Sequence, residues 1–350
     1  MRCRASSSPP RTMTRRWRRL RNNQRERLQA GSLVGGAHPS GRPRFRVQTK
    51  RHKRRMPNMN EAKIGDADRA YFNGRIQKIE TESSVLVSSS KYLNNPMLRT
   101  LIAQEMLRRN GPDLPNTAYI PEVAQLLHDL EDMPRVIELF EMEKARLPLF
   151  AKWLEKRSLS NFTLAETKDC APGTLGAKIY DFMANSGYQL DLFFQEIQVV
   201  NDFTFYLRQT ALTHDIEHMV TGFGPNHGGE IALISANMHA KSRYFHPELS
   251  NFFSRIAFYL KAKTTMKDGL YYPEAMVVNL EAEFLGAQQG RNWKYPLMLV
   301  DWREYVDVQI EDIRRELNIT PVIDSRWDDT NRLCNEDDPN YGVPMMEAAE

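Results

Sequence analysis

A chain of 350 residues, of which 41% are hydrophobic, suits one large domain or two small ones and can bury a sizeable core. No apolar run approaches the ~20 residues that a membrane-spanning helix needs, which argues against an integral membrane protein. The three cysteines, Cys3, Cys170 and Cys334, are far apart and form no CxxC pair, which argues against a disulfide framework or a thiolate zinc site.

The formal net charge of +4 hides two oppositely charged parts. Residues 1–55 hold 18 Lys and Arg against one acid, Glu26, whereas the rest of the chain holds 30 Lys and Arg against 43 Asp and Glu. The body is therefore acidic, and binding to nucleic acid would depend on the basic segment alone. We expect no specific nucleic-acid partner.

Residues 1–60 are rich in Arg, Ser, Pro and Gly and have few large apolar side chains to offset the entropy of ordering. We predict a disordered basic leader. It could be a mitochondrial-type presequence, a basic arm, or the result of a mis-assigned start, the true start then being Met56 or Met59. The last interpretation is favoured because the segment lacks a clear apolar helical face.

From Ala70 onward, apolar residues recur at helical spacing, and alternating strand patterns are nearly absent. We therefore predict an all-α, single multi-helix domain over residues 61–324, followed by a polar tail over 325–350. The predicted helices are Pro121 to Leu139 (two short helices broken near Pro134), Ile137 to Trp153, a helix that follows the turn Ala171 to Gly176 and runs through Phe182, Leu190 to Val220, Leu249 to Leu260, Pro273 to Gly290 and Asp307 to Leu317.

One predicted helix carries an aromatic stripe that has two interpretations. Leu249, Phe252, Phe253, Ile256 and Leu260 share one face. The stripe could lie on a membrane surface. It is more often part of a core, and we favour that interpretation.

The stretch THDIEHMVTGFGPNHGGEI, residues 213–231, places several possible metal ligands close together. His214 and His218 are four residues apart, so on a helix they lie one turn apart on the same face. Asp215 lies about 100° round the helix from His214, at the edge of that face. Eleven residues separate His218 from Glu230, and the loop between them is rich in glycine, so the chain can reverse there. A second helix that opens at Glu230 would point this carboxylate back at the histidines.

Two imidazoles with one or two carboxylates suit zinc, iron or manganese. The alternative is a set of polar residues at an ordinary helix end, because His-x-x-x-His alone is a weak signal. We interpret His227 as a solvated loop residue. His239, on the second helix, is interpreted as a polar surface residue or one that supports a ligand.

The pattern His214-Asp215-x-x-His218, eleven residues, then Glu230 resembles the HDxxH-x11-E signature of the coenzyme Q (ubiquinone) biosynthesis protein 4 family. The resemblance covers roughly residues 120–322. It departs from the family in the basic leader and in the region from His239 to Met276, which is hard to align. Further segments that resemble the family are Ala171 to Gly176, Thr221 to Gly224, Gly229 to Leu233, Gly290-Arg291, Asp301-Trp302 and Ile313 to Ile319.

This resemblance implies an all-helical protein in which His214, Asp215, His218 and Glu230 hold a divalent metal, zinc foremost, with iron and manganese as alternatives. It also implies catalytic roles for Asp215 and Glu230. The implied reaction removes the C1 carboxyl of a polyprenylated 4-hydroxybenzoate-derived ring and replaces it with a hydroxyl, as a metal-dependent lyase or oxidative decarboxylase would.

The implied partners are the polyprenylated quinone precursor, other ubiquinone-biosynthesis proteins, a membrane surface and a second copy in a homodimer. The implied location is peripheral, at the cytoplasmic face of a bacterial inner membrane or, alternatively, at the matrix side of the mitochondrial inner membrane. A second hypothesis is a non-catalytic, lipid-binding scaffold that organises other quinone enzymes. The lack of a GxGxxG or CxxCH redox-cofactor motif favours this scaffold hypothesis.

Overall fold

The computed structural model describes residues 88–111, 114, 116–186, 190, 197–324 and 326–327, all within one compact unit, Thr81–Glu350. These residues form helices and no β-strand; the pairs Gly111–Leu114 and Thr174–Gln309 are isolated bridges. The predicted all-α, multi-helix fold is therefore confirmed for this part of the chain. The predicted leader over 1–60 lies outside the described residues, as does nearly all of the predicted tail. No described helix is both long enough and apolar enough to cross a membrane.

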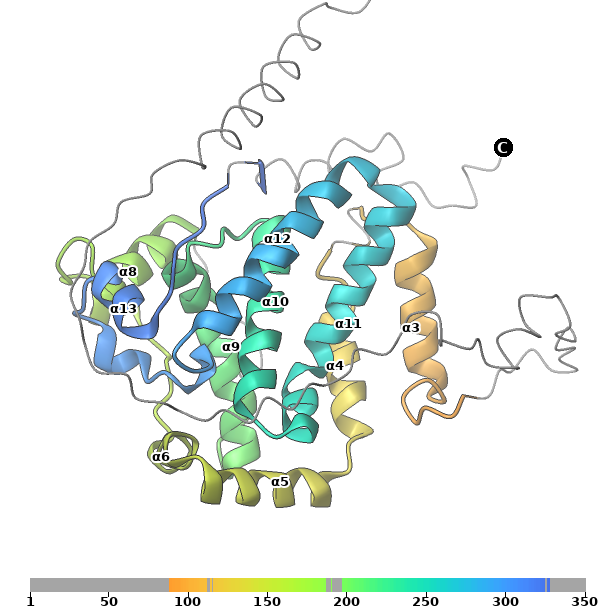
Figure 1. Cartoon of the computed structure of the whole chain (residues 1–350), viewed down its shortest axis with the longest axis horizontal. Helices are drawn as coiled ribbons and strands as arrows, with labels where there is room; N and C mark the ends of the chain where they lie inside the picture. The colour runs from red at the N-terminus through yellow and green to blue at the C-terminus, as the bar shows by residue number, and fades with distance from the viewer. Residues whose placement is uncertain are drawn as a thin grey trace, which may run out of the picture. The chain divides into compact units, whose positions relative to one another are not determined.

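Figure 1 shows the order of the helices in space. The helices are α3 (Pro96–Leu107), α4 (Ile120–Asp129), α5 (Met133–Arg146), α6 (Pro148–Lys156), α7 (Leu164–Thr167), α8 (Leu175–Ser186), α9 (Asp202–Thr221), α10 (His227–Tyr244), α11 (Pro247–Tyr271), α12 (Pro273–Asn292) and α13 (Ile310–Leu317), with short 3-10 helices at Leu297–Leu299 and Trp302–Tyr305.

Prolines and polar N-cap residues set where several helices begin. As a result, two predicted helices have different bounds in the structure. Pro148 opens α6, so the predicted helix from Ile137 to Trp153 is in fact two helices. Asn201 has an extended backbone, and its side chain accepts a hydrogen bond from the amide of Thr204. The predicted helix from Leu190 to Val220 therefore begins only at Asp202.

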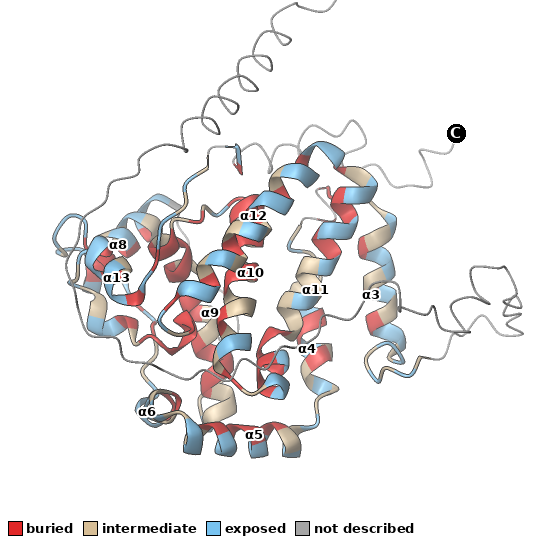
Figure 2. Cartoon of the chain, viewed as in Figure 1, coloured by how far each residue is buried: buried red, intermediate tan, exposed pale blue. Residues whose placement is uncertain are grey.

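Buried side chains gather between the helices, as Figure 2 shows. One cluster lies around the C-terminal half of α9 and α10, and a second, aromatic cluster lies around the N-terminal half of α9. Phe252 and Phe253 belong to the aromatic cluster, so the core interpretation of their stripe is confirmed. Trp327, within the predicted polar tail, is instead buried against Phe223.

Helix α10 packs closely along α12 through residues that lack large side chains. A Cβ added to Gly286 would lie 2.0 Å from the carbonyl oxygen of Ala232, and one added to Gly290 would lie 1.9 Å from that of Ala236. Real Cβ atoms do not approach a backbone oxygen so closely, so the two helices can meet here only because both positions are glycine. This contact fixes the helix that carries Glu230.

Candidate metal centre

The chain reverses between α9 and α10 because both helix ends are capped. Gly222 ends α9 with a φ of 76°, a left-handed conformation that glycine adopts without strain. From α13, the Arg314 guanidinium donates hydrogen bonds to the carbonyls of Val220 at 2.7 Å and Met219 at 3.4 Å. The Asn226 side chain accepts from the amide of Gly229 at 2.7 Å and starts α10. The last turn of α9 and the first turn of α10 therefore lie close together.

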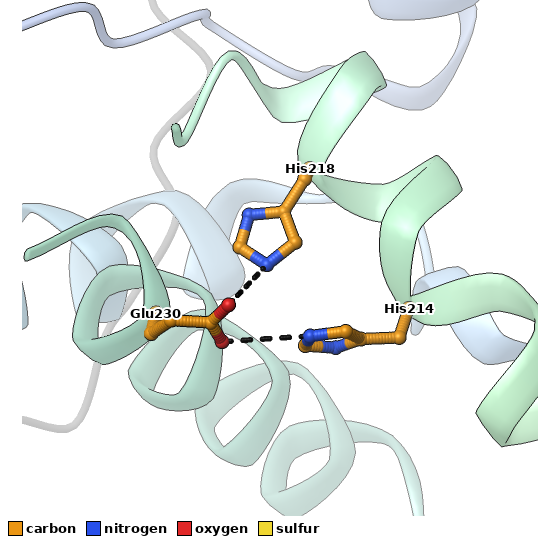
Figure 3. Close-up of side chains that lie close together, drawn as sticks. All are labelled: His214, His218 and Glu230. Carbon is orange, nitrogen blue, oxygen red and sulfur yellow. Dashed lines mark ion pairs between the residues drawn. The ribbon is translucent and has the colours of Figure 1, made fainter. Parts of the chain in front are cut away.

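His214, His218 and Glu230 meet across this reversal (Figure 3). The Oε1 atom of Glu230 lies 3.1 Å from Nε2 of His218, and its Oε2 atom lies 3.4 Å from Nε2 of His214. The imidazole centroids are 4.8 Å apart and the rings are nearly perpendicular. One ligand atom from each residue lies within 4.8 Å of the others. The sequence predicted this convergence from the helical spacing and the glycine-rich loop.

His218 has the hydrogen bonding of a metal ligand. Its Nδ1–H donates to the carbonyl oxygen of Phe223 at 2.9 Å, which leaves Nε2 as the atom that faces Glu230. This Nε2 is buried, and the polar atom that it faces is Oε1 of Glu230, at 3.1 Å. Two atoms that both carry lone pairs, Nε2 and Oε1, can lie this close only if a proton or a cation sits between them. A hydrogen bond from the second ring nitrogen to a carbonyl is also how metal-binding histidines are oriented. The set therefore fits zinc, iron or manganese.

Without a metal, Glu230 keeps a proton on His214. Desolvation opposes the charge on His214, but the Glu230 carboxylate outweighs it and raises the pKa of His214 to about 9. Desolvation also opposes the charge on Glu230, but the two histidines hold the pKa of its carboxyl well below the usual range. The His214 side chain is 47% exposed and that of His218 only 8%, so the site reaches solvent on the His214 side.

Asp215 does not join the three-residue group that the structure brings together. Its half-buried carboxylate acts on His214 through charge and favours the protonated ring. Its roles as a ligand and as a catalytic residue stay predictions.

Glu217 is a buried carboxylate beside the site that the sequence did not single out as functional. The Thr213 hydroxyl donates to its Oε1 at 3.2 Å, and the Asn237 amide donates to its Oε2 at 2.6 Å. Burial raises the pKa of Glu217, and burial lowers the pKa of Lys241, with each group opposing the shift of the other. In the sequence, only the four-residue spacing of Thr213 and Glu217 on one helix could have indicated the contact between them.

The interpretation of His227 as a solvated loop residue is wrong. His227 is the first residue of α10 and is 5% exposed. The Asn116 amide donates to its Nδ1 at 3.2 Å, and its Nε2 lies 3.6 Å from Oδ1 of Asp268. The error arose because Asn226 caps the helix, so α10 begins three residues before Glu230. His239 is partly exposed on α10, as expected of a polar surface residue.

The comparison with known protein families matches the region of the chain that contains the candidate centre. Residues 153–322 match the family described as Coenzyme Q (ubiquinone) biosynthesis protein Coq4. No curated protein matches the chain. A solved structure from Nostoc punctiforme, provisionally assigned as a ubiquinone biosynthesis protein, is 24% identical with a TM-score of 0.44, covering 58% of this chain and 93% of its own. The family match runs from within α6 to just past α13 and contains all three residues of the candidate centre. The resemblance to the Coenzyme Q (ubiquinone) biosynthesis protein Coq4 family that the sequence predicts is therefore confirmed over residues 153–322.

Proposed function

We propose that the protein acts in ubiquinone biosynthesis as a metal-dependent enzyme that replaces the C1 carboxyl of a polyprenylated 4-hydroxybenzoate-derived ring with a hydroxyl. The observation that carries this proposal is the convergence of His214, His218 and Glu230 within the family-matched region. The metal is a divalent ion, zinc foremost, with iron or manganese as alternatives.

The reaction breaks the bond between C1 and its carboxyl, releases CO2 and forms a C–O bond at the same carbon. The ring loses two electrons overall, so an oxidant is needed, and we assign dioxygen to this role. One of its oxygen atoms forms the new hydroxyl, and the other leaves as water after taking up two protons and two electrons from an external two-electron donor. A bound divalent metal supplies Lewis acidity toward the carboxylate or phenolate oxygens of the substrate.

Three residues of the chain have assigned roles in this reaction. Glu230 directs a separate oxygen at each imidazole, so both Nε2 atoms face the same carboxylate. His214 is the exposed member, and we therefore assign its side of the site to the substrate. Asp215, half-buried beside it, is assigned as the base that takes the phenol proton.

An apolar surface on α11 and α12 supports membrane association of this activity. Its large side chains are roughly half exposed or more, and they recur at helical spacing on each helix. A substrate with a polyprenyl tail resides in a membrane, so we assign this apolar face to the membrane surface. The face consists of Phe258, Met266, Leu270, Val277, Leu280 and Phe284.

Flotation with phospholipid vesicles tests the assignment of the face. Leu280→Glu with Phe284→Glu should abolish co-flotation, whereas Glu248→Gln, at an exposed position on α11 outside the face, should not. Co-flotation of the double variant at the wild-type level would reject this face as the membrane contact.

Turnover of a substrate with a 13C-labelled C1 carboxyl, under 18O2, tests the reaction. Supplied with a two-electron donor, metal-loaded wild type should release labelled CO2 and incorporate 18O, and Glu230→Gln should do neither, while Glu248→Gln stays active. The scaffold hypothesis makes the opposite prediction: Glu230→Gln would restore quinone synthesis fully in cells that lack the protein. That result would reject the enzymatic proposal.

A further inference from the structure

We infer that His227 is a positioning residue for the metal centre: it holds the first turn of α10, and with it Glu230, through side chains that include one from outside the family-matched region. This inference rests on the proposed metal-dependent function. Its starting point is the unexpected burial of His227 at the beginning of the helix that presents Glu230.

The first turn of α10 is weak because it contains two glycines, Gly228 and Gly229. Each glycine in a helix costs ~1 kcal/mol relative to alanine. A Cβ on Gly229 would lie 1.9 Å from the carbonyl oxygen of Gly224, and one on Gly228 would lie 2.9 Å from the ring of Trp327. Close packing therefore demands glycine at both positions. A turn that would otherwise fray must keep Glu230 beside the histidines.

Four side chains, which we call the His227 clamp, oppose this fraying: Asn116, His227, Asp268 and Asn279. The Asn116 amide nitrogen can only donate, so Nδ1 of His227 accepts and its Nε2 carries the proton. That Nε2 lies 3.6 Å from Oδ1 of Asp268, which is longer than a hydrogen bond, so this contact is an electrostatic one; the Asn279 amide donates to Oδ2 of the same carboxylate at 2.7 Å. His227, Asp268 and Asn279 are each at most 5% exposed, so water screens these contacts little.

The clamp joins α10 to α11 and α12 and to the segment before α4. His227 contacts Asp268 of α11, whereas Glu230, one turn later, faces the histidines of α9. The clamp therefore restrains the helix without touching the ligand atoms. Its effect on a metal would be one of position.

The position of Asn116 depends on an ion pair that includes a residue from before the family-matched region. The Lys263 ammonium donates to the carbonyl oxygen of Asn116 at 2.6 Å and lies 3.4 Å from the Glu105 carboxylate of α3. Glu105 and Asn116 both precede residue 153, where the family match begins. Residues that precede the family-matched region thus support Glu230, which lies inside it.

Cobalt(II) binding to the full chain, followed by its visible absorption, tests the clamp. His227→Ala should weaken cobalt affinity about 10-fold, the lower end of the range for loss of a residue that hydrogen-bonds a metal ligand directly, because His227 acts only through the position of the helix. Its cobalt spectrum should shift toward that of Glu230→Gln. His227→Gln should rescue affinity to within about threefold, because an amide can accept from Asn116 and donate to Asp268.

Ser160→Ala is the matched control. It removes the hydroxyl that accepts a buried hydrogen bond from the Gln209 amide at 2.8 Å, outside the clamp and its supports, so it should lower the melting temperature and leave cobalt affinity and spectrum unchanged. Equal loss of affinity in Ser160→Ala and His227→Ala at equal loss of stability would overturn the inference, as would wild-type cobalt binding by His227→Ala.

Hydrogen exchange of the metal-free protein separates this inference from the proposed function. The amide of Glu230 donates a hydrogen bond to the carbonyl oxygen of Asn226 at 2.9 Å. Its hydrogen should exchange with solvent at least tenfold faster in His227→Ala than in wild type. Faster exchange in a protein whose wild type binds no divalent metal would support the clamp and reject the metal function. Unchanged exchange would overturn the clamp, whatever the protein binds.

Discussion

Replacing Gly286 with alanine should force α10 and α12 apart. The new Cβ would lie 2.0 Å from the carbonyl oxygen of Ala232, and ordinary contact begins near 3.4 Å, so the helices must separate by about 1.4 Å at this point. Neither group can rotate away, because the oxygen belongs to a helix backbone and the Cβ is fixed to another. Ala232 lies two residues from Glu230, so the candidate centre shifts with it.

The expected loss of stability follows from two opposing effects. Overpacking of a well-packed core costs about 1–3 kcal/mol and occasionally more, and a gap of ~1 Å along the interface forfeits up to half of the dispersion attraction there. Alanine returns up to ~1 kcal/mol through its better helix propensity. The net loss should be about 1–3 kcal/mol, or about 2–12 °C in Tm for a domain of this size.

Thermal unfolding followed by circular dichroism measures this loss, with Gly269→Ala as the control. A Cβ on Gly269, within α11, meets no atom within 4 Å, so alanine there should stabilise by up to ~1 kcal/mol. If Gly286→Ala melts at or above the wild-type temperature, the close backbone contact between α10 and α12 does not exist in solution.

Three further predictions concern the candidate centre. Asn226→Ala removes the cap of α10 and should lower stability by ~1 kcal/mol, read as a Tm lower by about 2–4 °C; an unchanged Tm would exclude the cap. Zinc at 100 times its Kd should stabilise wild type by ~2.7 kcal/mol, and a chelator should reverse this; the same gain in His218→Ala would place the metal elsewhere. In the metal-free protein, Glu230 overcomes desolvation and raises the pKa of His214 to about 9, above the ~6.5 of an unfolded chain. The stabilisation is therefore complete below pH ~6.5 and is lost as pH rises through about 9. Melting temperatures between pH 6 and 10 should show this loss in wild type and not in His214→Gln.

The sequence predicted those parts of the site that depend on local geometry. Residues four apart on a helix share a face whatever surrounds them, so His214 and His218 could be placed together in advance. The glycine-rich loop likewise predicted that Glu230 returns to them. The helices that follow a regular apolar spacing, such as α12, were predicted nearly to the residue.

The missed features depend on contacts between distant residues. His227 reads as a loop residue in sequence because its partners, Asn116 and Asp268, lie 111 residues before it and 41 residues after it. Glu217 likewise depends on Asn237, from the next helix. No local pattern shows that such polar side chains are buried, since burial of a polar group becomes acceptable only when a tertiary partner satisfies it.

The Arg314 guanidinium that caps the end of α9 also constrains the order of events during synthesis. The capped carbonyls belong to residues 94 and 95 positions earlier in the chain. While the ribosome is still translating the intervening helices, the last turn of α9 has no such cap, and Trp327 cannot yet cover Gly228. The nascent chain therefore exposes His218 and Glu230 before their final geometry exists. The arrangement of the candidate centre is thus completed only after Trp327 has been translated.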